Sequence, residues 1–194
     1  TALQSGNYRL TEWQAAILLG GLRRLDAQVK LRDQNAIYLN SLLAQIPGVI
    51  PMRRRPQVTQ QSYYNFGFRL DWDALGVSGV NNSHFCAALT AELGHIFERP
   101  YQPLNSCGLY KPHTKRRHNL NKAYWRAIDP KRFDLPVCTA AHSRTGVVTM
   151  HNLLLGSRKD MDDVVNAVAK VVENVESLKN IKNVQMTKWR ALAD

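Results

Sequence analysis

The 194-residue sequence contains few cysteines, few acidic residues and no long apolar run. Its three cysteines, Cys86, Cys107 and Cys138, are widely spaced and odd in number. Their spacing excludes a disulfide framework and a cysteine-based metal site, and it predicts free thiols in a reducing, cytoplasmic compartment. No apolar run approaches the roughly 20 residues that a membrane-spanning helix requires, and no signal-peptide pattern is present.

The shortage of acidic residues leaves a strong positive charge. Asp and Glu number 15 against 26 Lys and Arg, which gives a formal net charge of +11. The basic residues cluster at Arg53–Arg55 and Lys115–Arg117. No nucleic-acid-binding motif accompanies these clusters, and aromatic residues do not alternate with them as stacking platforms. An anionic cofactor or substrate, or an acidic partner domain, explains the charge better than specific nucleic-acid binding.

The histidines do not predict a metal site. His113 and His118 are five residues apart, which fits no helical ligand pair, and the lysine and arginines between them repel a cation. The remaining histidines, His84, His95, His142 and His151, occur singly. We interpret them as surface or hydrogen-bonded core residues rather than as catalytic bases.

The most informative stretch is a polar loop that runs into a long amphipathic helix. Thr11 suits an N-cap, and Gln14 completes a capping box. Apolar residues then recur every three or four positions, at Ala15, Leu18, Leu19, Leu22, Leu25 and Val29. The pattern predicts a helix over residues 11–45, roughly 50 Å long and bent at Gly20-Gly21. We interpret its apolar face as core packing, with a dimer seam as the alternative.

The loop before this helix suits an anion. Asn7, Tyr8 and Arg9 stand just ahead of the helix start. Free backbone N–H groups attract negative charge at such a position, and the guanidinium of Arg9 adds a charged donor. The loop therefore predicts a phosphate site.

Downstream of Pro47-Gly48 the patterns predict alternating strands and helices. We expect loops over 52–61 and 71–78, strands over 62–70, 96–98 and 147–150, a helix over 84–93 capped by Asn82 or Ser83 and stopped by Gly94, and a last helix from Ser157 to about Leu178. This order predicts an α/β fold in which helices cover one face of a small sheet.

The predicted organisation has three parts. Residues 1–46 form an N-terminal loop and a long helix between domains or subunits, residues 47–180 form a small α/β domain, and residues 181–194 form a C-terminal tail. Residues 100–136 have the weakest periodicity and the densest polar chemistry. Their candidate ligand-binding residues are Tyr101, Asn105, Tyr110, Lys111, His113, Lys115, Arg116, Arg117 and His118, which suit a polyhydroxylated or phosphorylated ligand. The alternative is a solvated basic loop.

Several motifs resemble those of one enzyme family. They are Gly6-Asn7-Tyr8-Arg9-Leu10-Thr11-Glu12-Trp13-Gln14-Ala15-Ala16-Ile17, Tyr101-Gln102-Pro103-Leu104-Asn105, Leu109-Tyr110-Lys111-Pro112-His113-Thr114-Lys115-Arg116-Arg117-His118, Tyr124-Trp125-Arg126-Ala127-Ile128-Asp129-Pro130 and Leu154-Leu155-Gly156. The chain resembles the DegT/StrS-type aminotransferases, which are pyridoxal-phosphate enzymes of fold type I. Within them it is most similar to the glutamine-dependent aminotransferases of scyllo-inosose and 2-deoxy-scyllo-inosose. The resemblance covers about residues 5–178.

The resemblance implies that the chain is the C-terminal part of such an enzyme, an α/β small domain with a long N-terminal helix and a small mixed sheet covered by helices. In the family the lysine that forms the Schiff base lies before the Asn-Tyr-Arg loop, so we expect no catalytic residue in this chain. Asn7 and Arg9 are the implied cofactor-binding residues, and they would approach the pyridoxal phosphate of the other subunit. The implied substrate-binding residues are Tyr8, Asn105, Tyr110, Lys111, His113, Lys115 and Arg117. Asn105 stands where many family members have histidine, which leaves an acid–base role there unsupported.

The complete enzyme is expected to be a cytoplasmic homodimer of aminocyclitol or amino-sugar biosynthesis, as in antibiotic pathways. It would take an amino group from glutamine or glutamate and transfer it, with pyridoxal 5'-phosphate, to a keto-cyclitol or keto-sugar. This piece alone is expected to be inactive. Two other interpretations stay open: a non-catalytic structural or dimerisation module, and a basic nucleic-acid-binding protein.

Overall fold

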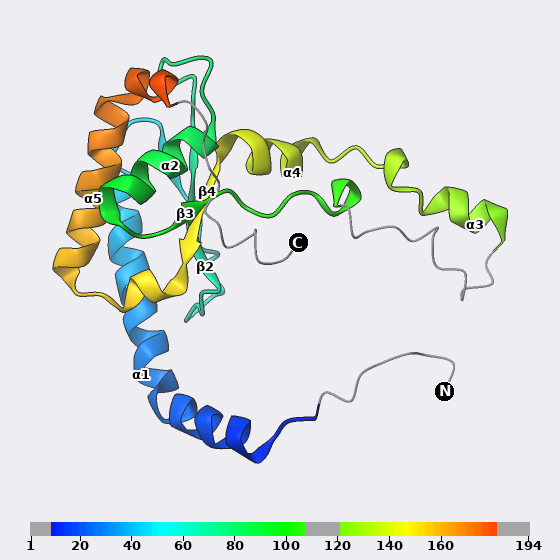
Figure 1. Ribbon diagram of the computed structural model, residues 1–194. Coiled ribbons are helices and arrows are strands. Elements are labelled where there is room, and N and C mark those ends of the chain that lie inside the picture. Colours follow the sequence, from blue (N-terminus) through cyan, green and yellow to red (C-terminus); the bar gives the residue numbers. More distant parts are fainter. Residues whose placement is uncertain (1–8, 108–120, 182–194) are drawn as a thin grey trace.

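The computed structural model describes residues 9–107 and 121–181 (Figure 1). The longer helices are α1 (Glu12–Leu43), α2 (Asn82–Leu93) and α5 (Arg158–Glu173), and the strands are β1 (Val49–Pro51), β2 (Asn65–Leu70), β3 (Phe97–Glu98) and β4 (Gly146–Met150). The shorter helical segments are η1 (Leu104–Ser106), α3 (Lys122–Ala127), η3 (Pro130–Arg132), α4 (Pro136–Ala140), the π-helical η4 (Ala141–Thr145), η5 (His151–Leu155) and η6 (Val175–Asn180). None of the described helices is long and apolar enough to cross a membrane.

The strands form one sheet in the order β1-β2-β4-β3, and every neighbouring pair is antiparallel. The expected sheet is therefore confirmed, but it is not mixed. The reason is that β4 returns beside β2 in the opposite direction, with Val147 opposite Phe68. The sequence did not predict β1, because three residues are too few to show an alternating pattern.

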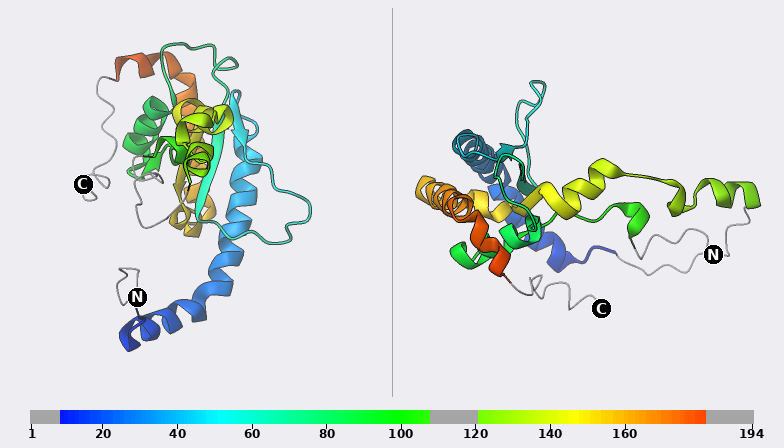
Figure 2. Two further views of the ribbon diagram at one scale, coloured as in Figure 1. Left: turned by 90° about the vertical axis from the view of Figure 1, so that its right-hand side faces the viewer. Right: turned by 90° about the horizontal axis from the view of Figure 1, so that it is seen from above.

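Three helices, α1, α2 and α5, lie on one face of the sheet, as predicted (Figures 1 and 2). Alternate residues of β2 point toward these helices, so Phe66, Phe68 and Leu70 are buried. The largest fully buried apolar side chains come from the sheet, all three helices and η5: Phe68, Phe85, Leu39, Leu43, Leu70, Leu89, Leu154, Met161, Val147 and Val168. One contiguous core therefore joins the two layers.

The helix α1 begins as predicted, because its capping box is complete. The Thr11 hydroxyl accepts from the Gln14 backbone N–H, and the Gln14 side-chain oxygen accepts from the Thr11 N–H. The helix changes direction in its first part, in keeping with the predicted bend (Figure 1). Its second half carries the buried face, with Ala36, Leu39 and Leu43 fully inaccessible.

The prediction that the first leucines of α1 pack in the core is wrong. Leu18, Leu22 and Leu25 keep 59%, 63% and 44% of their surface exposed. This part of α1 extends beyond the sheet, so the described chain offers nothing to cover it (Figures 1 and 2). An amphipathic pattern identifies an apolar face, but it does not identify what that face packs against.

The other elements follow the prediction with small shifts. Asn81, not Asn82 or Ser83, caps α2, and Asn82 is the first helical residue. Gly94 ends α2 at φ 62°, the left-handed conformation that favours glycine. The strand predicted over 62–70 begins three residues late, at Asn65. Ser157 caps α5 through the predicted capping box, but the α-helix ends at Glu173 and η6 continues to Asn180.

A buried amide side chain on α1, that of Asn35, ties this helix to the segment before α5. Asn35 is 2% exposed, and its Nδ2 donates to the carbonyl oxygens of Leu154 at 3.0 Å and Gly156 at 2.8 Å. These carbonyls belong to η5 and the turn before α5. One side chain therefore joins α1 to the connection between the sheet and α5.

Replacing this amide should destabilise the domain. Asn35→Ala leaves two carbonyls without their donor, which should lower the free energy of unfolding by about 1–3 kcal/mol. Denaturant unfolding followed by circular dichroism measures the change. Gln34→Ala is the matched control, because the adjacent Gln34 side chain is exposed. Equal stability of the two variants would contradict the assigned role of Asn35.

Candidate functional site

A pocket of about 810 Å³ lies on the face of the sheet opposite the helices. Because Phe66 and Phe68 point into the core, the alternate β2 residues Asn65, Gly67 and Arg69 point to this open face. The residues that line the pocket come from α1, the loop after β1, β2, β4 and the residues beside them: Ile37, Asn40, Met52, Arg53, Arg54, Gln61, Tyr63, Asn65, Phe66, Gly67, Phe68, Arg69, Pro100, Ala141, Gly146, Val147 and Val148. Its size is that of an ordinary small-molecule site.

The pocket has an apolar floor, two guanidinium groups that are available to a ligand, and two buried amide oxygens without partners among the described residues. Arg53 and Arg69 are exposed and form no ion pair with any residue that the structure describes. The side-chain oxygens of Asn40 and Asn65 are buried without a hydrogen-bond donor among the described residues. Free guanidinium groups suit an anion, and unpaired amide oxygens suit hydroxyl or N–H donors. The pocket can therefore bind a small anionic or polyhydroxylated molecule.

The phenol of Tyr63 is a neutral donor at this site. Burial, and then the negative charge of Asp33, raise the pKa of Tyr63 above its ordinary value. The group therefore stays protonated at neutral pH, when it can donate to a ligand or accept from it.

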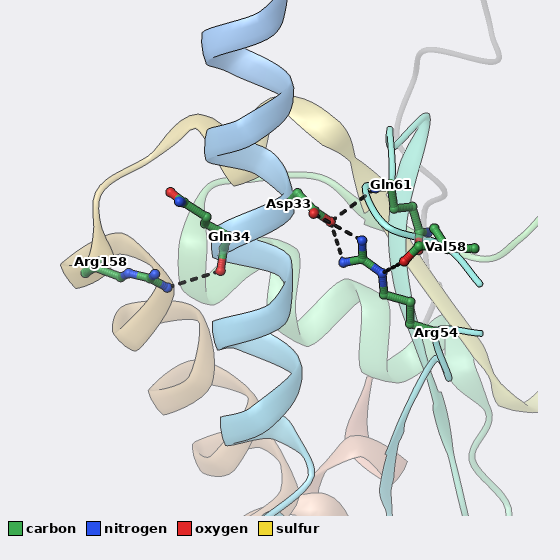
Figure 3. Close-up of polar contacts among 6 residues, drawn as sticks. All are labelled: Asp33, Gln34, Arg54, Val58, Gln61 and Arg158. Carbon is green, nitrogen blue, oxygen red and sulfur yellow. Dashed lines mark hydrogen bonds and ion pairs between the residues drawn. The ribbon is translucent and has the colours of Figure 1, made fainter. Parts of the chain in front are cut away.

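A bidentate ion pair holds one wall of the pocket (Figure 3). Nη1 and Nη2 of Arg54 lie 2.8 and 3.2 Å from the two carboxylate oxygens of Asp33, on α1. Nε of Arg54 donates to the Val58 carbonyl at 3.0 Å, and the Gln61 N–H donates to Asp33 at 3.4 Å. These contacts fasten the loop over 52–61 to α1. The loop therefore forms a fixed wall of the pocket.

Arg158 holds the other side of α1 (Figure 3). Its Nη1 donates to the Gln34 carbonyl at 3.3 Å, and its guanidinium carbon lies 4.3 Å from the centre of the Tyr38 ring. The Tyr38 hydroxyl donates to Asp162 at 2.7 Å, and this bond is the main cause that raises the pKa of Tyr38. The helix is therefore fixed between the pocket wall and α5.

The structure describes three of the candidate residues. Tyr101 is exposed, and its hydroxyl lies 2.9 Å from that of Tyr64. The other two are Arg9 and Asn105. Arg9 is exposed on the segment before α1, and Asn105 lies in η1, where its Nδ2 donates to the Phe133 carbonyl at 2.7 Å. The two lie on separate extensions of the domain, and neither lines the pocket (Figure 1). The other candidate residues lie outside the described residues: Asn7, Tyr8, Tyr110, Lys111, His113, Lys115, Arg116, Arg117 and His118.

The pocket itself was not predicted from the sequence. Its only signal was the alternation of β2, in which Asn65, Gly67 and Arg69 stand between buried residues. That pattern shows an open face, but it does not show that Arg53 and Pro100 border the same space. Within the described ranges no cluster of His, Cys, Asp and Glu could hold a metal ion.

Comparisons with known proteins agree with the motifs. A model of the DegT/DnrJ/EryC1/StrS aminotransferase family matches residues 3–143. L-glutamine:2-deoxy-scyllo-inosose aminotransferases of Streptoalloteichus tenebrarius and Streptomyces fradiae are 42% and 41% identical to this chain over 170 residues. L-glutamine:scyllo-inosose aminotransferase of Streptomyces griseus is 35% identical over 169 residues. Each match covers 87% of this chain and 39% of the relative, so the chain spans about two-fifths of the relatives' length.

A solved structure shows the same fold. The crystal structure of 3-amino-5-hydroxybenzoic acid synthase superimposes with a TM-score of 0.61 over 87% of this chain and 40% of that protein, at 23% sequence identity. The likeness confirms the predicted fold class and carries no further conclusion at this identity.

The Asp33–Arg54 pair should depend on its forked geometry. Arg54→Lys keeps the charge but can make only one of the two contacts, so it should release the loop over 52–61 and increase its cleavage by trypsin several-fold. Limited proteolysis followed by mass spectrometry measures this change. Arg55→Lys is the matched control, because Arg55 is the exposed neighbour. Equal cleavage of the two variants would show that the pair does not hold the loop.

The cysteines should differ sharply in reactivity. Burial raises the pKa of the Cys86 thiol to about 12, so at pH 8 it remains a protonated, inert thiol. Cys138 is exposed. We expect iodoacetamide at pH 8 to modify Cys138 in the folded protein and Cys86 only after unfolding, as determined by peptide mass mapping. Rapid labelling of Cys86 in the folded protein would contradict its buried environment.

Proposed function

The chain belongs to the DegT/DnrJ/EryC1/StrS aminotransferase family, and we propose that it is the C-terminal portion of a transaminase acting on a keto-cyclitol or keto-sugar. The observation that carries the proposal is the 42% identity, over 87% of the chain, with an L-glutamine:2-deoxy-scyllo-inosose aminotransferase. Glutamine, or glutamate, is the proposed amino donor. We place the reaction in cytoplasmic aminocyclitol or amino-sugar biosynthesis, including antibiotic biosynthesis.

Pyridoxal 5'-phosphate is the cofactor that the family implies, and it supplies the electron sink for amino transfer. The described residues fit only its phosphate end. Arg9 is exposed, has no ion-pair partner among the described residues and stands at the N-terminus of α1, a suitable environment for a dianion. Among the residues that line the pocket there is no lysine and no carboxylate, and Asp33, behind Arg54, is paired with it. As the resemblance implies, we place the reactive lysine outside the described residues.

The chain's own contribution is to bind and orient. Asn7 would hold the cofactor phosphate, and Arg9 would orient the cofactor or the substrate. Asn105 has its amide nitrogen engaged by Phe133, so its side-chain oxygen is the atom that accepts a substrate hydroxyl. Because an amide does not titrate, Asn105 positions the substrate and transfers no proton. The remaining substrate contacts are proposed for Tyr8, Tyr110, Lys111, His113, Lys115 and Arg117.

We propose that these groups act across a homodimer. Arg9 precedes the first turn of α1, and the pocket begins at Ile37 and Asn40 of the same helix. At 1.5 Å per residue the helix from Glu12 to Asn40 spans about 40 Å, far more than a small molecule can bridge. Arg9 and the pocket of one chain therefore serve different active sites. The exposed leucines of α1 also favour a dimerisation role, which remains the second candidate function if no chemistry is found.

Subunit complementation of the complete enzyme tests the proposal. One inactive subunit carries Arg9→Gln, and the other lacks the reactive lysine. A mixed dimer regains one complete site if Arg9 acts on its partner, so random mixing should restore about a quarter of wild-type turnover of glutamine and 2-deoxy-scyllo-inosose. The 194-residue chain alone should show no turnover.

Three outcomes decide between the possibilities. Recovery in the mixture supports action across the dimer. Activity in the complete enzyme without recovery shows that Arg9 acts within its own subunit. Turnover by the 194-residue chain alone, or none by the complete wild-type protein with any keto-cyclitol or keto-sugar, contradicts the proposed function. Wild-type protein treated in the same way is the control for losses during mixing.

A further inference from the structure

A long excursion of the chain leaves and returns at one place on the domain. We define the arm as the described residues 101–107 and 121–140, which extend away from the body (Figure 1), and the root as Pro100 with residues 141–146. Nδ1 of His142 lies 2.7 Å from the Pro100 carbonyl oxygen. A Cβ atom on Gly146 would lie 2.5 Å from Cγ of Pro100, so the Pro100 ring packs directly against the Gly146 backbone. The two ends of the arm are therefore joined at the root.

The root contains carbonyl groups that its own helix cannot satisfy. Residues 141–145 form a single π-helical turn, closed by the Gly146 N–H on the Ala141 carbonyl. The last carbonyls of any helix lack partners within it, and π-turns occur frequently at functional sites. Donors must therefore come from elsewhere in the fold.

The missing donors come from Asn82 and Trp72. Asn82 is fully buried, and its Nδ2 lies 2.7, 3.1 and 3.3 Å from the carbonyl oxygens of Gly146, His142 and Ala141. Nε1 of Trp72 donates to the Arg144 carbonyl at 2.6 Å. Side chains from the first turn of α2 and the turn after β2 thus hold both sides of the π-turn.

The surroundings also fix how the Asn82 amide is oriented. Its side-chain oxygen is buried without a partner among the described residues. Turning the amide around would aim this oxygen at three carbonyl oxygens and remove the Asn82 donor from all of them, which is the worse arrangement. The donors of Asn82, rather than its acceptor, therefore account for an amide at this position.

We propose that Asn82 is a positioning residue that fixes the root and, through it, the direction in which the arm leaves the domain. The arm carries Asn105 and continues on both sides of the predicted substrate-binding residues. The expected effect of Asn82 on catalysis rests on the proposed function. The effect of Asn82 on the root does not rest on that function, so the two effects are measured in separate experiments.

Amide exchange followed by NMR tests the effect on the root. In Asn82→Ala the exchange rate of the Trp72 indole N–H and the Gly146 N–H should rise roughly tenfold or more, the loss expected for one or two buried hydrogen bonds. The Gly94 N–H, bonded to Thr90 in α2, should stay within about twofold. Ser83→Ala is the matched control, since the hydroxyl of this adjacent residue makes no hydrogen bond with a described residue.

Gly146→Ala provides an independent variant, in case Asn82→Ala folds poorly. Its φ of −79° suits alanine, so the added methyl acts only by displacing Pro100 and the Ala141 carbonyl. It should accelerate exchange of the Trp72 indole N–H and leave Gly94 unchanged. Local acceleration in either variant supports the proposal. Unchanged exchange at the root in both variants, or equal acceleration at Gly94, overturns it.

Steady-state kinetics of the complete enzyme test the effect on catalysis. Asn82→Ala and Gly146→Ala should raise KM for the keto substrate severalfold while the rate of the half-reaction with glutamine is retained, because the arm positions only the substrate. Ser83→Ala should leave both constants unchanged. Faster exchange at the root with an unchanged KM would support Asn82 as the residue that fixes the arm. The same result would contradict the proposal that the arm binds the substrate. Activity lost equally in all steps would indicate general destabilisation and contradict the positioning role.

Discussion

The arrangement depends on how the second half of α1 is held against the domain. Asn35 joins it to the connection before α5, and Asp33 joins it to the loop after β1 through Arg54. Ala36, Leu39 and Leu43 bury the face between these two ties. Apolar burial supplies most of the stability, but it is not directional. The polar contacts of Asn35 and Asp33 fix the rotation of α1 about its axis and its position along that axis. They thereby fix the position of the pocket wall.

Features that depend on neighbouring residues were predictable from the sequence. The capping boxes at Thr11 and Ser157 each need only a partner three residues away, and both are present. The turn at Gly94 needs only a residue that accepts a positive φ. Alternation in β2 gave its buried face because a strand with one covered face has a period of two. The family followed from motifs of the same local kind.

Features that depend on distant residues were not predictable in the same way. Asn82 was predicted as a helix cap because Asn favours that position. The structure has Asn81 in the extended backbone conformation of the cap instead. The Asn82 side chain therefore contacts residues about 60 positions away. The leucines of α1 read as core because their spacing is helical, although the described chain does not cover them. The pocket joins side chains from α1, the loop after β1, β2 and β4, and no single stretch of sequence contains that combination.

The exposed leucines of α1 and the distance along α1 from Arg9 to the pocket both bear on the proposed dimer. A two-fold axis pairs a surface with its own copy, so the exposed stripe around Leu18 and Leu22 would face the same stripe of the partner. With the two helices antiparallel, as we propose, the start of each α1 would point toward the partner's body. Arg9 would then approach a site that its own helix, about 40 Å long up to the pocket, prevents it from reaching within one chain. The proposed dimer would thus cover the exposed stripe and also give the remote Arg9 a site to act on.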